Sequence, residues 1–285
     1  MKVLIIGKSG QLANELITEQ PNIIEARCLG RADVDITKTE SIDKAISDFQ
    51  PQIIINASAY TAVDKAESNQ EAAYNLNQHA VANLARSAKK HQARLLHVST
   101  DFVFDGNNNK AYLINDKTNP TCIYGASKLA GEQEILSIYP ENSAIIRTSW
   151  LYSSFGNNFV KTMIKLMQEK DELGVVCDQI GCPTYAKGLA HFLWKLTSVE
   201  SLDNIYHWSD YGVATWYDFA VAIQENAFNK GLLTKKITIK PIPTSSYPTP
   251  AVRPSFSLLN ANQSYYIEPS EHWTSQLIQC MANLH

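Results

Sequence analysis

A tyrosine and a lysine four residues apart, Tyr124 and Lys128, have the chemistry of a proton donor and the group that tunes it. Residues at positions i and i+4 of a helix lie on one face, so the phenol and the ammonium would be neighbours. A nearby ammonium favours the phenolate, which makes the tyrosine proton easier to give up. The Thr100 hydroxyl could hold the oxygen that changes charge. These are the parts of a general acid for carbonyl reduction.

Taken alone, this pair is better explained as part of an ordinary half-buried helix, because Tyr-x-x-x-Lys spacings are common by chance. The N-terminal sequence favours the catalytic explanation instead. A short apolar run over residues 3–6 ends in Gly7, and a helical pattern covers residues 11–19. Gly7 and Gly10 would let the backbone approach a pyrophosphate at the positive end of that helix, and Ala13 is small enough for close packing. A tight strand-to-helix turn without a ligand is the alternative.

The residues after the second predicted strand, 23–29, indicate which cofactor is used. An NAD-specific site would place an acidic residue there for the ribose hydroxyl, whereas this chain has Gly30 and Arg31. An arginine can bind a 2′-phosphate through two parallel hydrogen bonds. NADPH is therefore expected, with NADH as the alternative, and Asp33 or Asp35 could reach the ribose or the adenine.

Strands and helices alternate regularly through the first half of the chain, which predicts a doubly wound α/β fold with a parallel sheet, Rossmann-like in type. Small residues follow the third strand and polar residues follow the fourth, and both groups should meet at the carboxyl edge of the sheet. The further predicted strands cover residues 53–55, 94–99 and 144–147, and the further predicted helices cover 40–49, 70–92 and 122–139.

The alternation loosens beyond Trp150. Residues 1–150 are predicted to form an NADP-binding domain, and residues 151–285 a smaller, mainly substrate-binding subdomain with segments that return to the core. Five prolines over residues 241–254 predict an ordered loop or a linker. Thr215 is placed to cap a helix over residues 216–227. The other elements expected here are helices over 158–169 and 186–199, strands over 173–177 and 205–208, and a loop over 178–184.

Composition excludes several classes of function. The 285 residues are 45% apolar and 19% charged with a net charge of −3, which is typical of a globular protein with a sizeable core. No lysine and arginine cluster is present, which argues against a nucleic-acid partner. The apolar run over residues 3–6 is too short for a signal peptide or a membrane span. Five scattered cysteines support neither a disulfide framework nor a zinc site, so a reducing cytoplasm is expected.

Taken together, the motifs resemble those of the dTDP-4-dehydrorhamnose reductases, a family of the extended short-chain dehydrogenase/reductase group. The resemblance covers nearly the whole chain, and its last three segments lie in the substrate-binding part, where the wider group diverges. The matching segments are residues 7–12, 62–67, 99–104, 124–132, 147–152, 156–159, 178–184 and 247–254.

The resemblance implies a role for each site residue. Tyr124 would donate the proton, Lys128 would tune it and contact the ribose, and Thr100 would be the third catalytic residue. The nucleotide-sugar would contact Thr100, Asp101, Val63, Trp150 and Arg253, the last of which could instead hold the proline-rich loop. The expected cofactor site consists of Gly7, Gly10, Gln11, Leu12, Arg31, Asp35, Ile36, Ala57, Ala59, Tyr60, Thr61, Tyr124 and Lys128.

Some members of the family carry Mg²⁺ at a dimer contact built from glutamates. Glu15 matches one of those ligands, but Lys187 stands where a second acidic residue is expected. A lone carboxylate that faces a lysine is a poor magnesium site. We therefore expect no metal, and a monomer or a weak homodimer.

The function implied is the NADPH-dependent reduction of the C4 ketone of dTDP-4-dehydro-L-rhamnose to dTDP-L-rhamnose. A reductase of a different dTDP-4-keto-6-deoxyhexose would share all these motifs. Sugar-nucleotide dehydratases and epimerases use the same scaffold, but the related dehydratases place Asp-Glu after the threonine, and here Phe102 follows Asp101. A non-catalytic NADP-binding regulatory subunit is a further alternative, against which the intact Thr100, Tyr124 and Lys128 weigh.

Overall fold

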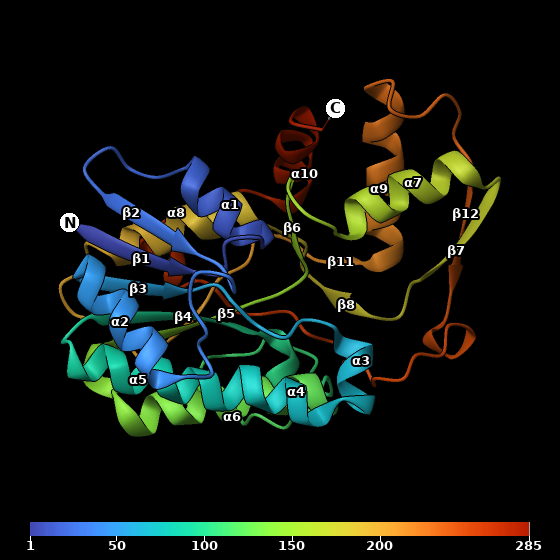
Figure 1. Cartoon of the computed structure of the whole chain (residues 1–285). Helices are drawn as coiled ribbons and strands as arrows, with labels where there is room; N and C mark the ends of the chain where they lie inside the picture. Colours follow the sequence, from blue (N-terminus) through green and yellow to red (C-terminus); the bar gives the residue numbers. More distant parts are fainter. Residues whose placement is uncertain (285) are drawn as a thin grey trace.

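A six-stranded sheet lies at the centre of the computed structural model, which describes residues 1–284 (Figure 1). Every neighbouring pair of strands is parallel. Strands β1 and β3 are apolar on both faces and buried, as expected of central parallel strands. The predicted α/β fold with a doubly wound parallel sheet is thus confirmed. In spatial order the strands are β10 (Ile205–His207), β5 (Ser143–Thr148), β4 (Arg94–Thr100), β3 (Ile53–Asn56), β1 (Lys2–Ile6) and β2 (Glu25–Leu29).

The strand order reverses between β1 and β3. From β1 the chain moves outward to β2 on one side, and then builds β3, β4 and β5 on the other. Ligands of such sheets bind in the crevice outside the carboxyl ends of the strands at this switch point. The residues that leave the sheet there are Gly7 after β1 and Ala57 after β3.

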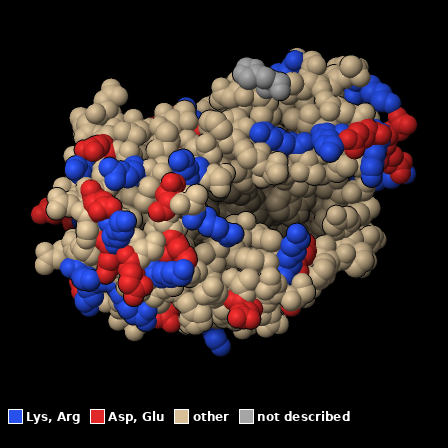
Figure 2. Space-filling view, in the orientation of Figure 1, with Lys and Arg blue, Asp and Glu red and all other residues tan. Residues whose placement is uncertain are grey.

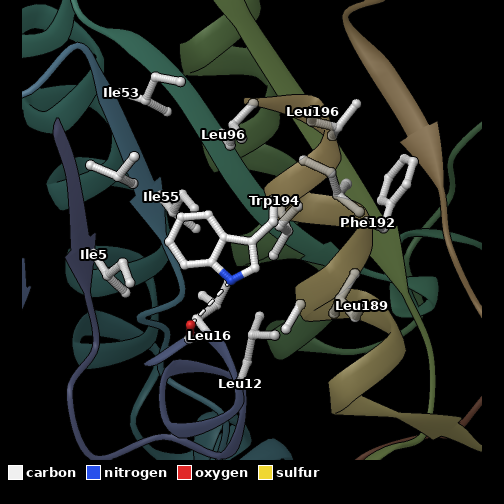
Figure 3. Packing of buried hydrophobic residues seen from close by; sticks show 14 of the residues in the cluster. Ile5, Leu12, Leu16, Ile53, Ile55, Leu96, Leu189, Phe192, Trp194 and Leu196 are labelled. Carbon is white, nitrogen blue, oxygen red and sulfur yellow. Dashed lines mark hydrogen bonds between the residues drawn. The ribbon is translucent and has the colours of Figure 1, made fainter. Parts of the chain in front are cut away.

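Helices cover both faces of the sheet (Figure 1). Helices α2 (Thr39–Phe49), α5 (Ala80–Lys90) and α6 (Ile123–Ile138) pack on one face. Helices α1 (Gln11–Thr18) and α8 (Ala186–Leu196) pack on the other. Figure 3 shows this second face, where the Trp194 indole nitrogen donates a hydrogen bond of 3.1 Å to the carbonyl of Leu16. Helix α8 and strand β10 belong to this core although they lie far along the chain.

The predicted long helix over residues 70–92 is a continuous helical segment over residues 70–90, but its middle is π-helical. Helix α4 (Gln70–Tyr74) and helix α5 are separated by a π-helical turn over Asn75–His79. A Cβ on Gly131 of α6 would lie 2.1 Å from the carbonyl oxygen of Asn77, so only glycine permits this contact. The Asn77 side chain bonds to the backbone of Tyr60 at 2.8 and 3.2 Å. The turn therefore fixes the loop that follows β3.

A second apolar core supports a smaller lobe, to which helix α10 (Trp273–Ala282) contributes. Thr215 and Asp218 form a reciprocal cap at the start of α9, which confirms the predicted role of Thr215. The remaining elements of this lobe and its junction are β6 (Leu151–Tyr152), α7 (Phe159–Glu169), β7 (Glu172–Val176), β8 (Ile180–Gly181), β9 (Thr184–Tyr185), β11 (Ala214–Thr215), α9 (Trp216–Asn229) and β12 (Thr238–Ile242).

Two local predictions in this lobe need correction, and one helix was not predicted. Pro241 was expected in a loop, but it lies in β12, whose only partner strand within residues 1–284 is β7. An edge strand tolerates proline because its outer side needs no N–H donor. The predicted loop over residues 178–184 includes the short strands β8 and β9, and helix α10 was not predicted.

Two expectations concern the chain as a whole. No helix within residues 1–284 is long and apolar enough to cross a membrane. All five cysteines are free thiols in the structure.

Candidate active site

Two adjoining cavities of about 750 and 530 Å³ lie at the carboxyl edge of the sheet. They share Gly10 and the residues that follow β3, among them Ala57 and Ala59. Figure 2 shows the molecule hollowed between the large and the small lobe. The cavities therefore form one cleft long enough for an extended ligand.

The glycine turn shapes the floor of this cleft. Gly7 has a φ of +123°, and a Cβ there would lie 2.9 Å from the backbone of Ala57. The Gly7 carbonyl accepts a hydrogen bond of 2.9 Å from the Gly10 amide, which closes the turn. Helix α1 then begins at Gln11 without a side-chain cap. Its first N–H groups thus remain available for a phosphate.

Arg31 and Lys8 lie on the wall of the larger cavity, and both are exposed. Asp33 accepts a hydrogen bond of 2.9 Å from the Gly30 amide and lies 3.8 Å from the Lys8 ammonium. Asp35 accepts two hydrogen bonds from Thr37, so its carboxylate stabilises the loop after β2. Lys8 was not predicted as a site residue, because the glycine motif does not specify which residue stands at that position.

The predicted site residues divide between the two cavities, with one exception, Arg253. Those on the larger cavity are Gly7, Gly10, Arg31, Asp35, Ile36, Ala57, Ala59, Tyr60 and Thr61. Those on the smaller cavity are Gln11, Leu12, Val63, Thr100, Asp101, Tyr124, Lys128 and Trp150, together with Gly10, Ala57, Ala59 and Thr61, which belong to both.

Tyr124 lies in the first turn of α6. The Cys122 sulfur accepts a hydrogen bond from the Gly125 amide, and a Glu67 oxygen accepts one of 2.8 Å from the Ile123 amide. A Cβ on Gly125 would lie 2.2 Å from the carbonyl oxygen of Phe102, so the helix start packs tightly on the segment after β4. Burial raises the pKa of Tyr124, and a hydrogen bond with Thr100 opposes that rise.

The Lys128 side chain is directed into the core. Its Nζ lies 2.7 Å from the Val98 carbonyl oxygen and 3.2 Å from His97 Nε2, and it makes no hydrogen bond with Tyr124 among the described residues. Burial lowers the pKa of Lys128 to about 8, against an opposing effect of Glu132. The expected pairing of Lys128 with the Tyr124 phenol is therefore not seen, because the Lys128 amino group bonds to β4 instead. His97 was missed, although a histidine inside an apolar strand is a signal that could have found it.

Asp101 is buried at the end of the cleft beside Thr100. Its Oδ1 accepts a hydrogen bond of 3.0 Å from the Thr100 hydroxyl. Burial raises the pKa of Asp101 to about 6, and hydrogen bonds with Ser257 and Thr100 oppose the rise. The carboxyl group can exchange hydrogen bonds with a polyhydroxylated ligand in either protonation state.

Trp150 lines the smaller cavity and stacks on Trp216, a residue that was not predicted and does not line that cavity. The two rings stack with centroids 3.6 Å apart and planes 8° from parallel. Trp150 has a φ of +45°, an unfavourable conformation of a kind that is concentrated at functional sites. A Cβ on Gly181 would lie 2.7 Å from the Trp150 ring, so glycine is needed there. Trp216 also donates a hydrogen bond of 3.2 Å to Gln179.

Arg253 lines a further cavity of about 630 Å³ in the small lobe, together with Trp216 and Gln179. Its guanidinium makes two hydrogen bonds, of 3.0 and 2.8 Å, to the carboxylate of Asp64 on α3 (Val63–Ser68). It also donates to the Thr249 hydroxyl. The pair lowers the pKa of Asp64 and joins the proline-rich loop to the large lobe.

Glu15 of α1 and Glu19, which follows the end of this helix, do not fit a divalent cation. Glu15 is buried and accepts a hydrogen bond from Ser153, while Glu19 pairs with Lys187 at 2.9 Å and with His191 at 2.8 Å. Lys187 was expected to face Glu15, but its ion pair is with Glu19. Lys187 and His191 thus occupy the Glu19 carboxylate, and no group of three potential metal ligands occurs within residues 1–284.

Comparisons with known proteins place this geometry in context. The chain matches the family described as RmlD substrate binding domain over residues 1–285. The dTDP-4-dehydrorhamnose reductase of Aggregatibacter actinomycetemcomitans is 40% identical over 280 residues, which is 95% of each chain.

Two solved structures of dTDP-4-dehydrorhamnose reductases are similar throughout. That from Bacillus anthracis, in complex with NADP, is 35% identical with a TM-score of 0.93, over 99% of this chain and 98% of the other. That from Clostridium acetobutylicum is also 35% identical, with a TM-score of 0.92 over 99% of both chains.

Proposed function

We propose a mechanism on one premise: the chain belongs to the RmlD family, that of the dTDP-4-dehydrorhamnose reductases. It is an NADPH-dependent oxidoreductase that reduces the C4 ketone of dTDP-4-dehydro-L-rhamnose to give dTDP-L-rhamnose. The observation that supports the site is the convergence of Thr100, Tyr124 and Lys128 on one cavity that is continuous with the glycine turn.

The residues of the larger cavity fit the cofactor. The free N–H groups at the start of α1 and the absence of a side chain at Gly10 suit a pyrophosphate, and Arg31 with Lys8 suits a 2′-phosphate. When bound, NADPH supplies the hydride. The described residues contribute binding and orientation on this side of the cleft.

In the smaller cavity, Tyr124 donates a proton to the alkoxide that forms at C4. The Thr100 hydroxyl, which donates to the Asp101 carboxylate in the free protein, would turn to donate its hydrogen to the same oxygen. Asp101 accepts hydrogen bonds from sugar hydroxyls, Val63 lines the same cavity, and the stacked Trp150 ring covers an apolar face of the sugar. Fixed donors of this kind stabilise charge only where it develops.

The direct test mixes the purified protein with NADPH and dTDP-4-dehydro-L-rhamnose and follows the nicotinamide absorbance. Stoichiometric NADPH oxidation with formation of dTDP-L-rhamnose is expected. NADPH binding without oxidation would contradict the assignment and leave another keto-sugar or a regulatory subunit. Conversion of a nucleotide-sugar without net NADPH consumption would indicate an epimerase or a dehydratase.

Arg31 should determine the preference for NADPH. The Arg31→Ala change removes a charge-assisted contact worth about 1.5–3 kcal/mol, so KM for NADPH should rise roughly 10- to 150-fold. KM for NADH should stay the same, because NADH lacks the 2′-phosphate. Steady-state kinetics with both cofactors measures the effect, and Arg86→Ala, on the exposed side of α5, is the matched control. An equal rise for both cofactors would contradict the assignment.

Arg253 is proposed to bind the substrate diphosphate by exchanging its Asp64 partner. Arg253→Ala should raise KM for the nucleotide-sugar by about tenfold or more, because a charge-assisted contact is lost. Asp64→Asn keeps the shape but releases the guanidinium, so it should lower that KM. If Arg253 only holds the proline-rich loop to α3, Asp64→Asn will instead raise that KM, as Arg253→Ala does, and both variants will lower the melting temperature.

Three further assignments, of the domains, the cellular location and the oligomeric state, complete the proposal. Residues 1–150 would provide most of the NADP-binding domain, and residues 151–285 most of the substrate-binding subdomain, with α8 and β10 returned to the sheet. The five free cysteines support a cytoplasmic address. The proposed oligomeric state is a monomer or a weak homodimer.

A further inference from the structure

A chain of buried polar groups runs from the loop after β3 to the catalytic lysine. The Ser58 amide donates to Asn56 Oδ1 at 3.1 Å, and Asn56 Nδ2 lies 3.0 Å from His97 Nδ1. His97 Nε2 lies 3.2 Å from Lys128 Nζ, which is 2.7 Å from the Val98 carbonyl oxygen. Asn56, His97 and Lys128 are each at most 2% exposed. Water therefore does not replace the contact between Asn56 and His97, and this contact must be made by a matching donor and acceptor.

The Ser58 amide fixes the direction of this chain. A backbone N–H can only donate, so the Asn56 atom that faces it must be the oxygen. The nitrogen of the same amide then faces His97, and it also can only donate. His97 Nδ1 must accept, so a neutral His97 carries its hydrogen on Nε2. Burial, with the Lys128 charge as a second cause, holds the pKa of His97 well below its usual range, so the ring is neutral.

This tautomer places an N–H donor against Lys128. An ammonium has three donors and no acceptor, so it cannot pair with that N–H, whereas an uncharged amine has a lone pair. The amine completes the chain, because it accepts from His97 and donates to the Val98 carbonyl. Burial also favours the uncharged amine, because it lowers the pKa of Lys128.

Other charged and titratable groups near Lys128 do not oppose this arrangement strongly. Glu132, one turn further along α6, favours the ammonium, but its carboxylate is bound by Arg147 of β5 at 2.7 Å. Tyr124, on the side of the cleft, is a neutral phenol in the free protein because burial raises its pKa. On β4, the remaining partner is the neutral Val98 carbonyl.

We propose that His97 is a positioning residue that holds Lys128 as an uncharged amine in the free protein, and that Lys128 takes a proton from solvent when NADPH binds. The ribose hydroxyls of the cofactor would replace His97 as partners and, unlike its N–H, can accept from an ammonium. Lys128 thus becomes charged, and able to stabilise the Tyr124 phenolate, only in the loaded site. The role of Lys128 rests on the proposed function, whereas its protonation can be measured without turnover.

Isothermal titration calorimetry with NADPH tests the proton uptake. Titrations at about pH 9, where an ordinary lysine is still charged, are run in two buffers with different ionisation enthalpies. The wild-type protein should take up close to one proton per NADPH more than Lys128→Met. Equal uptake by these two proteins would overturn the proposal.

Asn56→Asp reverses the polarity of the chain at almost constant shape. A carboxylate accepts from both the Ser58 amide and His97 Nδ1–H, which leaves a lone pair on Nε2 for an ammonium. The uptake should fall to the level of Lys128→Met, and uptake equal to that of wild type would contradict the role of His97.

Long-range ¹H–¹⁵N spectra of histidine-labelled protein report the tautomer directly, with the His97 signals assigned by their loss in His97→Asn. Hydrogen on Nε2 in wild type and on Nδ1 in Asn56→Asp is expected, a difference that the charge of the new carboxylate alone would not produce. Hydrogen on Nδ1 in the wild-type protein would overturn the proposal even if the variants fail to fold. Proton uptake in a protein that does not reduce the sugar would reject the proposed function and leave this inference intact.

Discussion

Replacement of Tyr124 by phenylalanine should lower kcat by about 100- to 10,000-fold, the usual contribution of a positioned general acid. The change removes only the phenol hydroxyl. The ring keeps its edge-to-face contact with Phe102, whose centroid lies 5.5 Å away, and α6 keeps its capped start. NADPH should bind with nearly unchanged Kd. Single-turnover kinetics and a fluorescence titration of NADPH measure the two quantities.

Tyr139→Phe is the matched control for this prediction. Tyr139 follows the end of α6, and its hydroxyl accepts a hydrogen bond from Asn142, far from the cleft. Its removal should leave kcat unchanged. If Tyr124→Phe retained more than a tenth of the wild-type kcat, Tyr124 would not be the acid, and Thr100 or a water molecule would take that place.

Replacement of Arg147 by methionine should lower the free energy of unfolding by about 3–5 kcal/mol, because it leaves a buried charge without its partner. Arg147 and Glu132 are both almost fully buried, and the guanidinium makes three contacts of 2.7 to 3.2 Å to the carboxylate. Urea denaturation followed by circular dichroism measures the change.

The double variant Arg147→Met/Glu132→Leu is the informative comparison. It removes both charges and replaces them by apolar groups, which is often nearly neutral for a buried pair. It should therefore be more stable than Arg147→Met alone. A double variant that is less stable than the single one would show that each residue stabilises the fold through other contacts.

The sheet and the glycine turn could be predicted from the sequence because their signals are local. Strand β1 is a continuous apolar run, and Gly7 and Gly10 follow it directly. The cap at Thr215 is equally local, since its partner Asp218 is three residues away. The convergence of Thr100 and Tyr124 followed from topology, because one ends a central strand and the other begins the next helix.

The features that could not be predicted depend on partners distant in sequence. Lys128 is turned toward His97, 31 residues earlier, and the family motif does not specify that neighbour. Arg253 is bound to Asp64, which is 189 residues away. Pro241 opposes a strand assignment locally, and only its pairing with β7 places it in β12. Local propensity is overridden in each case by tertiary contacts.

The position of β10 has a consequence for biosynthesis on the ribosome. Strand β5 ends at Thr148, but the strand that covers its outer edge begins at Ile205, and α8, which covers one face of the sheet, lies between them. At about 5–20 residues per second, translation of this interval takes several seconds. During that time the nascent chain has a complete β4–β5 pair with an unpaired edge and an uncovered apolar face. This interval of translation is when the protein most needs a chaperone, because an open strand edge is a template for aggregation.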